Sequence, residues 1–286
     1  MKTIIYFLIG IFIFGIVSVG FTNNSKTSNT IVIQSTEMNN SSVSLSNSAK
    51  IISDRLKDFS SESFDITVLS EKNQIKVELN SNWDVKTAEN LISNKGEVSF
   101  YETFNQESLS KLFSGTNQLY SLTNSNATNS SRVQIGCVSI REVDKVNDYI
   151  KTLGVNNECK FAWNQHFNDT IACLYALKVN SEKGGLLKYT DIESVKYIQD
   201  KSSKSIAIEI KLKKSAKELW SKATKRNIHN AIAIVLDNNV IFAPIVNSVI
   251  DGGLCEITGN FTENEAKYIA ALGNNGILPV NFMIVK

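Results

Sequence analysis

The first clearly patterned part of the chain begins near residue 30. The stretch "SAKIISDRLKDF" places Ile52, Leu56 and Phe59 at helical spacing, and "FDITVLSEKNQIKVEL" holds two alternating apolar runs around a polar turn, which predicts a hairpin. A second helix is expected from about Asp84 to Gly96, followed by the strand "EVSFYETF". With "TIVIQST" as the first strand, the predicted order is β-α-β-β-α-β, the ferredoxin-like arrangement.

The middle of the chain is less regular. A polar stretch of low complexity runs from Ser114 to Ser131. Beyond it, we expect a strand near Val133, a helix over "REVDKVNDYIKTLG" that ends at Gly154, and the strands "CKFAW" and "TIACLYALKV".

Patterning is strongest in the last third of the chain. "SIAIEIKLK" alternates apolar and polar positions, as a half-buried strand does, and a capping box at Ser215 and Glu218 predicts the start of a helix. Further strands are expected at residues 231–236, 240–246 and 254–258. A second capping box joins Thr262 to Glu265, its helix is expected to end at Gly273, and "ILPVNFMIV" is the final strand.

The amino terminus, "MKTIIYFLIGIFIFGIVSVGFTNN", has no charge from Thr3 to Phe21. That length is close to the roughly 20 apolar residues that a membrane-spanning helix needs. A cleaved signal peptide is the rival interpretation, but the apolar run is long for one and no Ala-x-Ala site follows. We favour a single-pass anchor in the inner (cytoplasmic) membrane. Lys2 would stay in the cytoplasm, so the rest of the chain is expected on the extracytoplasmic (periplasmic) side.

Charge excludes one class of partner. The 286 residues hold 30 Lys and Arg against 28 Asp and Glu, a net charge of +2 that creates no global field for nucleic acid. A basic cluster is expected to form the solvated face of one helix, with contact to acidic lipid headgroups or an acidic polypeptide as the alternative. Its members are Lys211, Lys213, Lys214, Lys217, Lys222, Lys225 and Arg226.

Four cysteines, Cys137, Cys159, Cys173 and Cys255, are expected in a compartment where disulfides persist. Four cysteines allow three pairings, and the sequence does not choose among them. Because Cys137 and Cys173 have apolar neighbours, we favour the interpretation that they are buried small hydrophobic side chains.

Residues with catalytic chemistry are sparse, so the sequence predicts no enzyme, cofactor or metal site. His166 lies in a polar turn, and His229 at a helix end. Asp237 and Asp251 stand at turns, where an aspartate bonds its own backbone. Only Ser108-x-x-Lys111 fits a Ser-Lys hydrolase spacing, and such a match is expected by chance in a chain this rich in both residues.

The motifs of the last third resemble the first extracytoplasmic domain of the SecD/SecDF preprotein translocase subunits. The resemblance rests on "AIVLD", "AP", "GG", "ITGNFT", "EA" and "LPV" in that order, and it is weaker upstream. Asn238 and Asn239 stand where the family commonly has Gly-Lys. The motif residues with an expected structural role are Asp237, Pro244, Gly252, Gly253, Gly259, Asn260, Phe261 and Pro279.

The resemblance implies a base and a mobile head that holds the emerging chain, in a protein that assists Sec-dependent export after the channel. Family members use the proton-motive force through charged residues in further membrane helices. This sequence has one candidate span without Asp, Glu or Arg, so we expect it not to act as a proton-driven motor alone.

Together these observations predict an α+β protein: a ferredoxin-like base and an α+β head after one N-terminal transmembrane helix. The expected parts are an anchor or signal segment (1–22), a base-like unit (23–105), a connecting α+β segment (106–190), a head-like subdomain (191–261), and a C-terminal helix and strand that pack back on the base (262–286).

The expected function is non-enzymatic: a membrane-anchored domain that binds emerging polypeptide or docks on the translocon. Expected partners are Sec translocon components or a full-length SecDF, unfolded exported polypeptide, and the membrane through the N-terminal helix. Ile241 and Phe242 are candidate polypeptide contacts, although a core role is the simpler interpretation of Ile241. The alternatives are a paralogous structural or interaction protein of the envelope that handles no substrate, and an exported hydrolase that uses Ser108 and Lys111.

Overall fold

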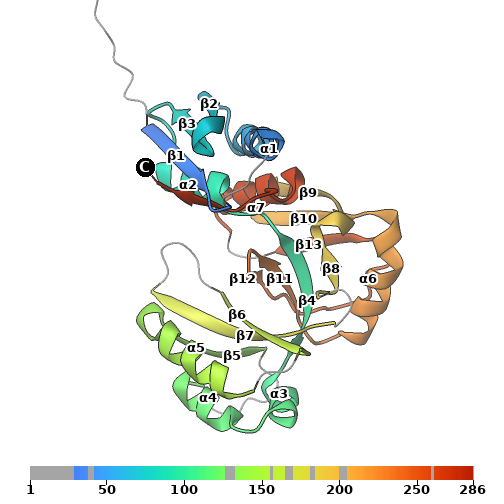
Figure 1. Ribbon diagram of the computed structural model, residues 1–286. Helices are drawn as coiled ribbons and strands as arrows, with labels where there is room; N and C mark the ends of the chain where they lie inside the picture. Colours follow the sequence, from blue (N-terminus) through green and yellow to red (C-terminus); the bar gives the residue numbers. More distant parts are fainter. Residues whose placement is uncertain are drawn as a thin grey trace, which may run out of the picture.

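The computed structural model describes residues 29–37, 42–125, 133–154, 157–164, 170–180, 184–199, 205–258 and 261–285. Helices and strands are mixed along the chain, and the strands form three sheets (Figure 1). The predicted anchor, residues 1–22, lies outside the described residues. Within them, no helix combines the length and the apolar character that a membrane crossing requires.

The first sheet has the strand order β14-β1-β3-β2, and every neighbouring pair is antiparallel. Ile31 and Ile33 of β1 alternate with exposed or half-buried neighbours, and they share a core with Ile75 and Val77 of β3. Helices α1 and α2 pack on this sheet. The elements are β1 (Asn29–Ser35), α1 (Ser42–Phe59), β2 (Phe64–Leu69), β3 (Gln74–Leu79), α2 (Val85–Ser93) and β14 (Phe282–Ile284).

The strand β4 (Val98–Phe104) does not close this sheet, so that prediction was wrong. β4 pairs with β11, β7 and β8, while β14 from the end of the chain takes the place beside β1. The reason lies in its two apolar faces. Val98 and Phe100 belong to the same core as Ile33 and Ile75, which we call the main core, whereas Tyr101 belongs to a different cluster. A strand that is buried on both faces suits the middle of the molecule.

The second sheet has the order β13-β10-β9 and continues the main core. Helix α7 packs on β9 and also on α1, so it joins this sheet to the first. Trp220 of α6 lies edge-on to Phe100 with ring centroids 5.5 Å apart. The elements are β9 (Ile192–Gln199), β10 (Ile206–Leu212), α6 (Lys214–Arg226), β13 (Leu254–Thr258) and α7 (Glu263–Asn275).

The third sheet runs β12-β11-β4-β7-β5, with β6 on β7 and β8 on β4. Three helices cover its far end and form a separate core around Leu109, Ile135, Val146 and Leu174, which we call the insertion core. In Figure 1, β4 runs from the region of α7 toward these helices. The elements are α3 (Gln106–Leu112), α4 (Thr116–Leu122), β5 (Gln134–Ser139), α5 (Val143–Thr152), β6 (Cys159–Asn164), β7 (Ile171–Lys178), β8 (Leu187–Lys188), β11 (Ile232–Leu236) and β12 (Asn239–Phe242).

Helix boundaries follow the sequence signals unevenly. The capping box of α7 is confirmed, because the Glu265 N–H donates to Thr262 Oγ1 at 3.2 Å and the Thr262 N–H donates to Glu265 Oε2 at 2.8 Å. The box predicted at Ser215 is absent, since α6 begins two residues earlier, with Lys213 as its N-cap and no side-chain cap bond.

The glycine stops are also displaced. α7 continues past Gly273 to Asn275, and α2 ends at Ser93, before Gly96. β12 ends at Phe242, and beyond it only isolated bridges pair residues 245 and 246 with residues 231 and 228.

Candidate functional site

The SecD-like motif begins at the turn between β11 and β12. Asp237 and Asn238 both have positive φ (49° and 73°), and Leu236 pairs with Asn239 across them. Two left-handed residues in succession make the tight turn that suits a twisted hairpin, and Asp and Asn accept that conformation more readily than most residues.

Asp237 does more than form the turn. Its carboxylate accepts the N–H groups of Gly96 (2.9 Å) and Glu97 (2.8 Å), and its own N–H donates to the Glu97 carbonyl at 3.1 Å. The prediction that it bonds its own backbone was therefore wrong. The carboxylate instead fixes the segment between α2 and β4, a contact that no sequence pattern could reveal across 140 residues.

Arg55 of α1 reaches the same segment. Its guanidinium donates to the carbonyls of Leu91 (3.1 Å), Asn94 (2.7 Å), Lys95 (2.8 Å) and Gly276 (2.7 Å), and its side chain is fully buried. These carbonyls lie at the ends of α2 and α7, where the helix dipoles favour a cation. Burial lowers the pKa of Arg55 to about 10, and the negative charge of Asp237 opposes that shift, so the side chain is charged at neutral pH.

Gly96 and Tyr268 complete this joint, which we define as Arg55, residues 94–97, Asp237 and Tyr268. Gly96 has a φ of 83°, and a Cβ there would overlap the Arg55 guanidinium. Tyr268 of α7 accepts a hydrogen bond from Asn94 Nδ2 at 2.6 Å, and burial raises the pKa of its hydroxyl to about 12. Sequence analysis missed Arg55, although an arginine within the stripe of Ile52, Leu56 and Phe59 was a usable signal.

The other motif residues have separate structural positions. Gly253 has a φ of 68°, and a Cβ there would press on Lys217, whereas Gly252 faces open space. Pro244 is exposed, and its carbonyl accepts the Ile232 N–H at 3.2 Å. Pro279 is exposed between two buried residues of the link from α7 to β14. Gly259 and Asn260 lie outside the described residues.

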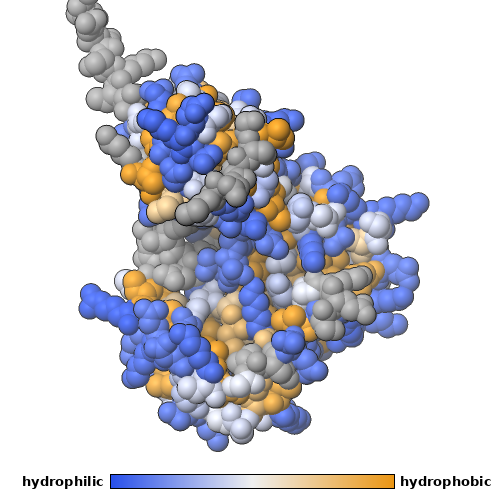
Figure 2. Space-filling model, viewed as in Figure 1, coloured by the Kyte–Doolittle hydropathy of each residue, from blue (hydrophilic) through white to orange (hydrophobic). Residues whose placement is uncertain are grey.

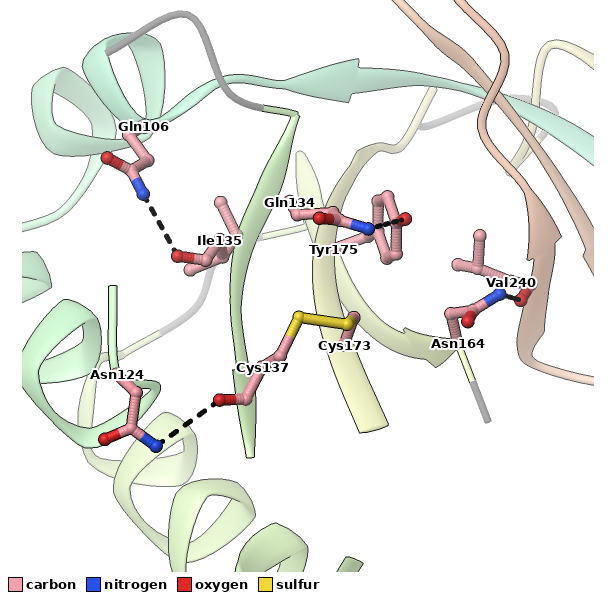
Figure 3. The surroundings of a disulfide bond; sticks show 9 residues. All are labelled: Gln106, Asn124, Gln134, Ile135, Cys137, Asn164, Cys173, Tyr175 and Val240. Carbon is pink, nitrogen blue, oxygen red and sulfur yellow. Dashed lines mark hydrogen bonds between the residues drawn. A yellow bond between two sulfur atoms is a disulfide. The ribbon is translucent and has the colours of Figure 1, made fainter. Parts of the chain in front are cut away.

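The candidate polypeptide contacts Ile241 and Phe242 are half-buried against the main core. The ring of Phe242 stands edge-on to Phe261, with centroids 4.4 Å apart. Asn164 of β6 donates to the carbonyls of Val240 (2.7 Å) and Ile241 (3.2 Å), as Figure 3 shows for Val240. These residues therefore join β12 to its neighbours, and the exposed apolar side chain of this loop is Ile245.

A disulfide joins Cys137 of β5 to Cys173 of β7 (Figure 3). The expectation of two buried free thiols was wrong, because the two residues are direct cross-strand neighbours, a pairing that depends on the register of β5 and β7. Cys159 and Cys255 are free and buried, and burial raises the pKa of each thiol to about 12. That shift suppresses the reactive thiolate at neutral pH.

The geometry gives the hydrolase interpretation no support. Ser108 is the third residue of α3 and forms a capping box with the N-cap Asn105: its Oγ accepts the Asn105 N–H, and its own N–H donates to Asn105 Oδ1. Lys111 instead pairs with Glu107 at 2.6 Å. Over the described ranges, no three His, Cys, Asp or Glu side chains are grouped as metal ligands would be. His229 is exposed with a φ of 67°, and His166 lies outside the described residues.

The basic cluster lies mostly on α6, as expected for a solvated helix face. Three of its members have acidic partners, since Lys211 pairs with Glu193, Lys222 with Glu218 and Arg226 with Glu102. The carboxylate of Asp251, in the loop before β13, accepts a hydrogen bond from the hydroxyl of Ser221 on α6 and does not bond its own backbone as predicted.

Comparison with known proteins agrees with the motif. Residues 176–280 match the family described as SecDF, P1 head subdomain. Protein translocase subunit SecD of Leptotrichia buccalis is 39% identical over 80 residues, covering 28% of this chain and 20% of that protein. SecD of Aquifex aeolicus is 45% identical over 74 residues, covering 26% of this chain and 14% of that protein. The chain thus matches only a fifth or less of these relatives' length.

Two solved structures share the fold at 18% identity. The structure titled "Crystal structure of SecDF in Super-membrane-facing form" has a TM-score of 0.55 over 90% of this chain and 29% of that chain. A second, titled "Structure and function of a membrane component SecDF that enhances protein export", has a TM-score of 0.51 over 90% of this chain and 98% of that chain. This protein is therefore similar to SecDF in fold over most of its length, and its residues 176–280 match the SecDF P1 head subdomain.

Proposed function

We propose that this protein is a non-enzymatic, membrane-anchored, extracytoplasmic SecD-like domain that assists Sec-dependent protein export. It binds emerging polypeptide or docks on the translocon. Its proposed protein partners are Sec translocon components or a full-length SecDF. The single observation that carries the proposal is the match of residues 176–280 to the SecDF P1 head subdomain. The fold likeness to SecDF over 90% of the chain supports it.

The finer arrangement is part of the same proposal. The base is a ferredoxin-like unit in which β14 serves as the fourth strand, because β14 pairs with β1 in the order β14-β1-β3-β2. Residues 1–22 serve as an N-terminal anchor in the inner membrane, a proposal that rests on the uncharged run from Thr3 to Phe21.

A photocrosslinking scan along residues 238–250 in living cells tests polypeptide contact. Ile245 is the best position in this scan, because its side chain is 57% exposed. Val43 on α1, 64% exposed, is the matched control on another element. The proposal expects secretory precursors or Sec components to be crosslinked from position 245 and not from position 43. Recovery of neither class from the whole scan would overturn it.

A further inference from the structure

Three strand edges in the described part of this protein are covered by polar groups from neighbouring segments, two by asparagine side chains and one by a backbone carbonyl. Asn274 of α7 accepts the Val195 N–H (2.8 Å) and donates to its carbonyl (2.9 Å), so it occupies the edge of β9 as a neighbouring strand would. The Thr123 carbonyl accepts the Cys137 N–H at 2.9 Å on the edge of β5. Asn164 bonds the carbonyls of β12 in the same manner.

No residue in the described ranges covers the edge of β2 in this way. The Asn80 N–H donates to the Ser63 carbonyl at 3.3 Å, so residues 65, 67 and 69 direct their backbone groups toward β3. Phe64, Ile66 and Val68 therefore direct theirs outward. Among the residues that the structure describes, none bonds these outward groups, and β2 contains no proline or register shift. At six residues, β2 is also longer than the outer strands β13 and β14, with five and three.

Apolar side chains line this open edge. Phe64, Ile66 and Val68 are only half-buried, and all three pack on the main core. Phe64 stands edge-on to Trp83 at 6.2 Å, and Phe59 stacks on the same Trp83 at 6.0 Å. In the space-filling view, the end of the molecule that carries this sheet shows hydrophilic surface interrupted by apolar patches (Figure 2). A strand laid beside β2 would cover the rest of these side chains.

Charge beside the edge specifies what would bind. The exposed Asp65 lies directly across from Glu78 on the solvent face, and the nearby Lys76 pairs with Glu78 at 2.9 Å. Adjacent carboxylates on neighbouring strands repel each other. A basic side chain on the far side of Asp65 would relieve that repulsion. A second copy of β2 would add a further Asp65 instead, so the charge pattern disfavours self-pairing.

We propose that β2 is a docking edge where an extended polypeptide segment with alternating apolar and basic residues adds as a further strand. Its backbone satisfies the outward groups of Phe64, Ile66 and Val68, its apolar side chains pack on Phe64 and Ile66, and a basic side chain lies beside Asp65. The inference rests on the proposed function for the identity of the polypeptide, namely an exported chain. It adds a contact on the first sheet to the polypeptide contact that the proposed function expects along residues 238–250, which we call the β12 loop.

Amide hydrogen exchange on the full chain tests this edge. The probe is a decapeptide of alternating valine and lysine, compared with one of alternating valine and glutamate. With the lysine peptide, the outward amides of residues 64, 66 and 68 are expected to exchange about tenfold more slowly, whereas those of 65, 67 and 69 are already protected and hardly change. The glutamate peptide is expected to give little protection.

Two variants at position 66 separate the contribution of the outward backbone N–H from that of the side chain. Ile66→Pro removes an outward N–H and blocks strand addition, and Ile66→Ala makes a similar loss of side chain but keeps the donor. We expect the alanine variant to retain most of the binding and the proline variant to lose it. Equal binding by both variants, no binding of the lysine peptide, or protection that rises with protein concentration alone overturns the inference.

The outcomes remain separable from those of the proposed function. If precursors are crosslinked from the β12 loop but the peptide does not protect the amides of β2 from exchange, only the proposed docking edge is overturned. If the peptide protects the amides of β2 but no precursor is crosslinked from any position in cells, the docking edge is supported and the proposed role in export is overturned.

Discussion

Arg55 of α1 and Asp237 of the turn between β11 and β12 both bind the backbone of the same four-residue segment, 94–97. Arg55 donates to the carbonyls of Asn94 and Lys95, and Asp237 accepts the N–H groups of Gly96 and Glu97. The segment leads from α2, which packs on the first sheet, to β4, a strand of the third sheet. The two side chains therefore join the parts of the molecule that we propose as base and head, and the SecD-like Asp237 is explained as a structural residue.

Loss of the Arg55 guanidinium should strongly destabilise the protein. Arg55→Met removes the guanidinium donor from one buried and three partly buried carbonyls, and we expect the free energy of unfolding to fall by about 3–5 kcal/mol. Chemical denaturation measures this change. Lys57→Met, in the exposed last turn of the same helix, is the control and should change it by less than about 0.5 kcal/mol. Equal effects of the two variants would contradict the role given to Arg55.

Gly96 and Gly252 form a matched pair for a second test. Gly96 has a φ of 83°, and Gly96→Ala introduces a Cβ that overlaps the Arg55 guanidinium. We therefore expect the free energy of unfolding to fall by about 1–3 kcal/mol. Gly252→Ala places its Cβ in open space and should be neutral or slightly stabilising. Thermal unfolding of both variants checks the order, and a Gly96→Ala protein as stable as the wild type would refute the overlap.

The disulfide should stabilise the insertion core. Cys137 and Cys173 are 36 residues apart, and closing a loop of that length stabilises a fold by about 4 kcal/mol on chain-entropy grounds. We expect the double Cys137→Ala, Cys173→Ala variant to lose up to that amount in denaturant unfolding. Thiol titration of the unfolded wild type should find two thiols before reduction and four after it. Four before reduction would contradict the assignment.

Stability in acid should depend on Glu102. Burial alone would raise the pKa of this carboxyl, but hydrogen bonds from Arg226 and Asn227 lower it below the usual 4.5. With a lower pKa in the folded state, its contribution is present above about pH 4.5 and is lost as the pH falls through the folded value. The stability difference between wild type and Glu102→Gln should therefore shrink below that pH. A difference that stays constant down to pH 3 would argue against the interaction.

Local elements of this fold were predictable because their signals are local. Thr262 and Glu265 lie three residues apart, and the hairpin of β2 and β3 is closed by its own turn, so the sequence pattern contained both. β4 was misassigned because "EVSFYETF" shows only that a strand is apolar on both faces and not which strands flank it. The partner of β1 lies some 250 residues away in β14, and only tertiary packing selects it.

The candidate site divides along the same line. The turn at Asp237 and Asn238 was predictable from the motif residues, but the N–H donors that bind the Asp237 carboxylate lie on a segment 140 residues away. The Cys137–Cys173 bond depends on strand register in the same way. Asn164 and Asn274 could not have been identified, because an asparagine that closes a strand edge looks in sequence like any polar residue.

The most direct test of the role in export is affinity purification of the chain from intact membranes after crosslinking in cells. We predict enrichment of Sec translocon components, together with secretory precursors, over a tagged single-pass envelope protein of similar abundance. A different envelope protein recovered in stoichiometric amount, with Sec components and precursors at the control level, would contradict it.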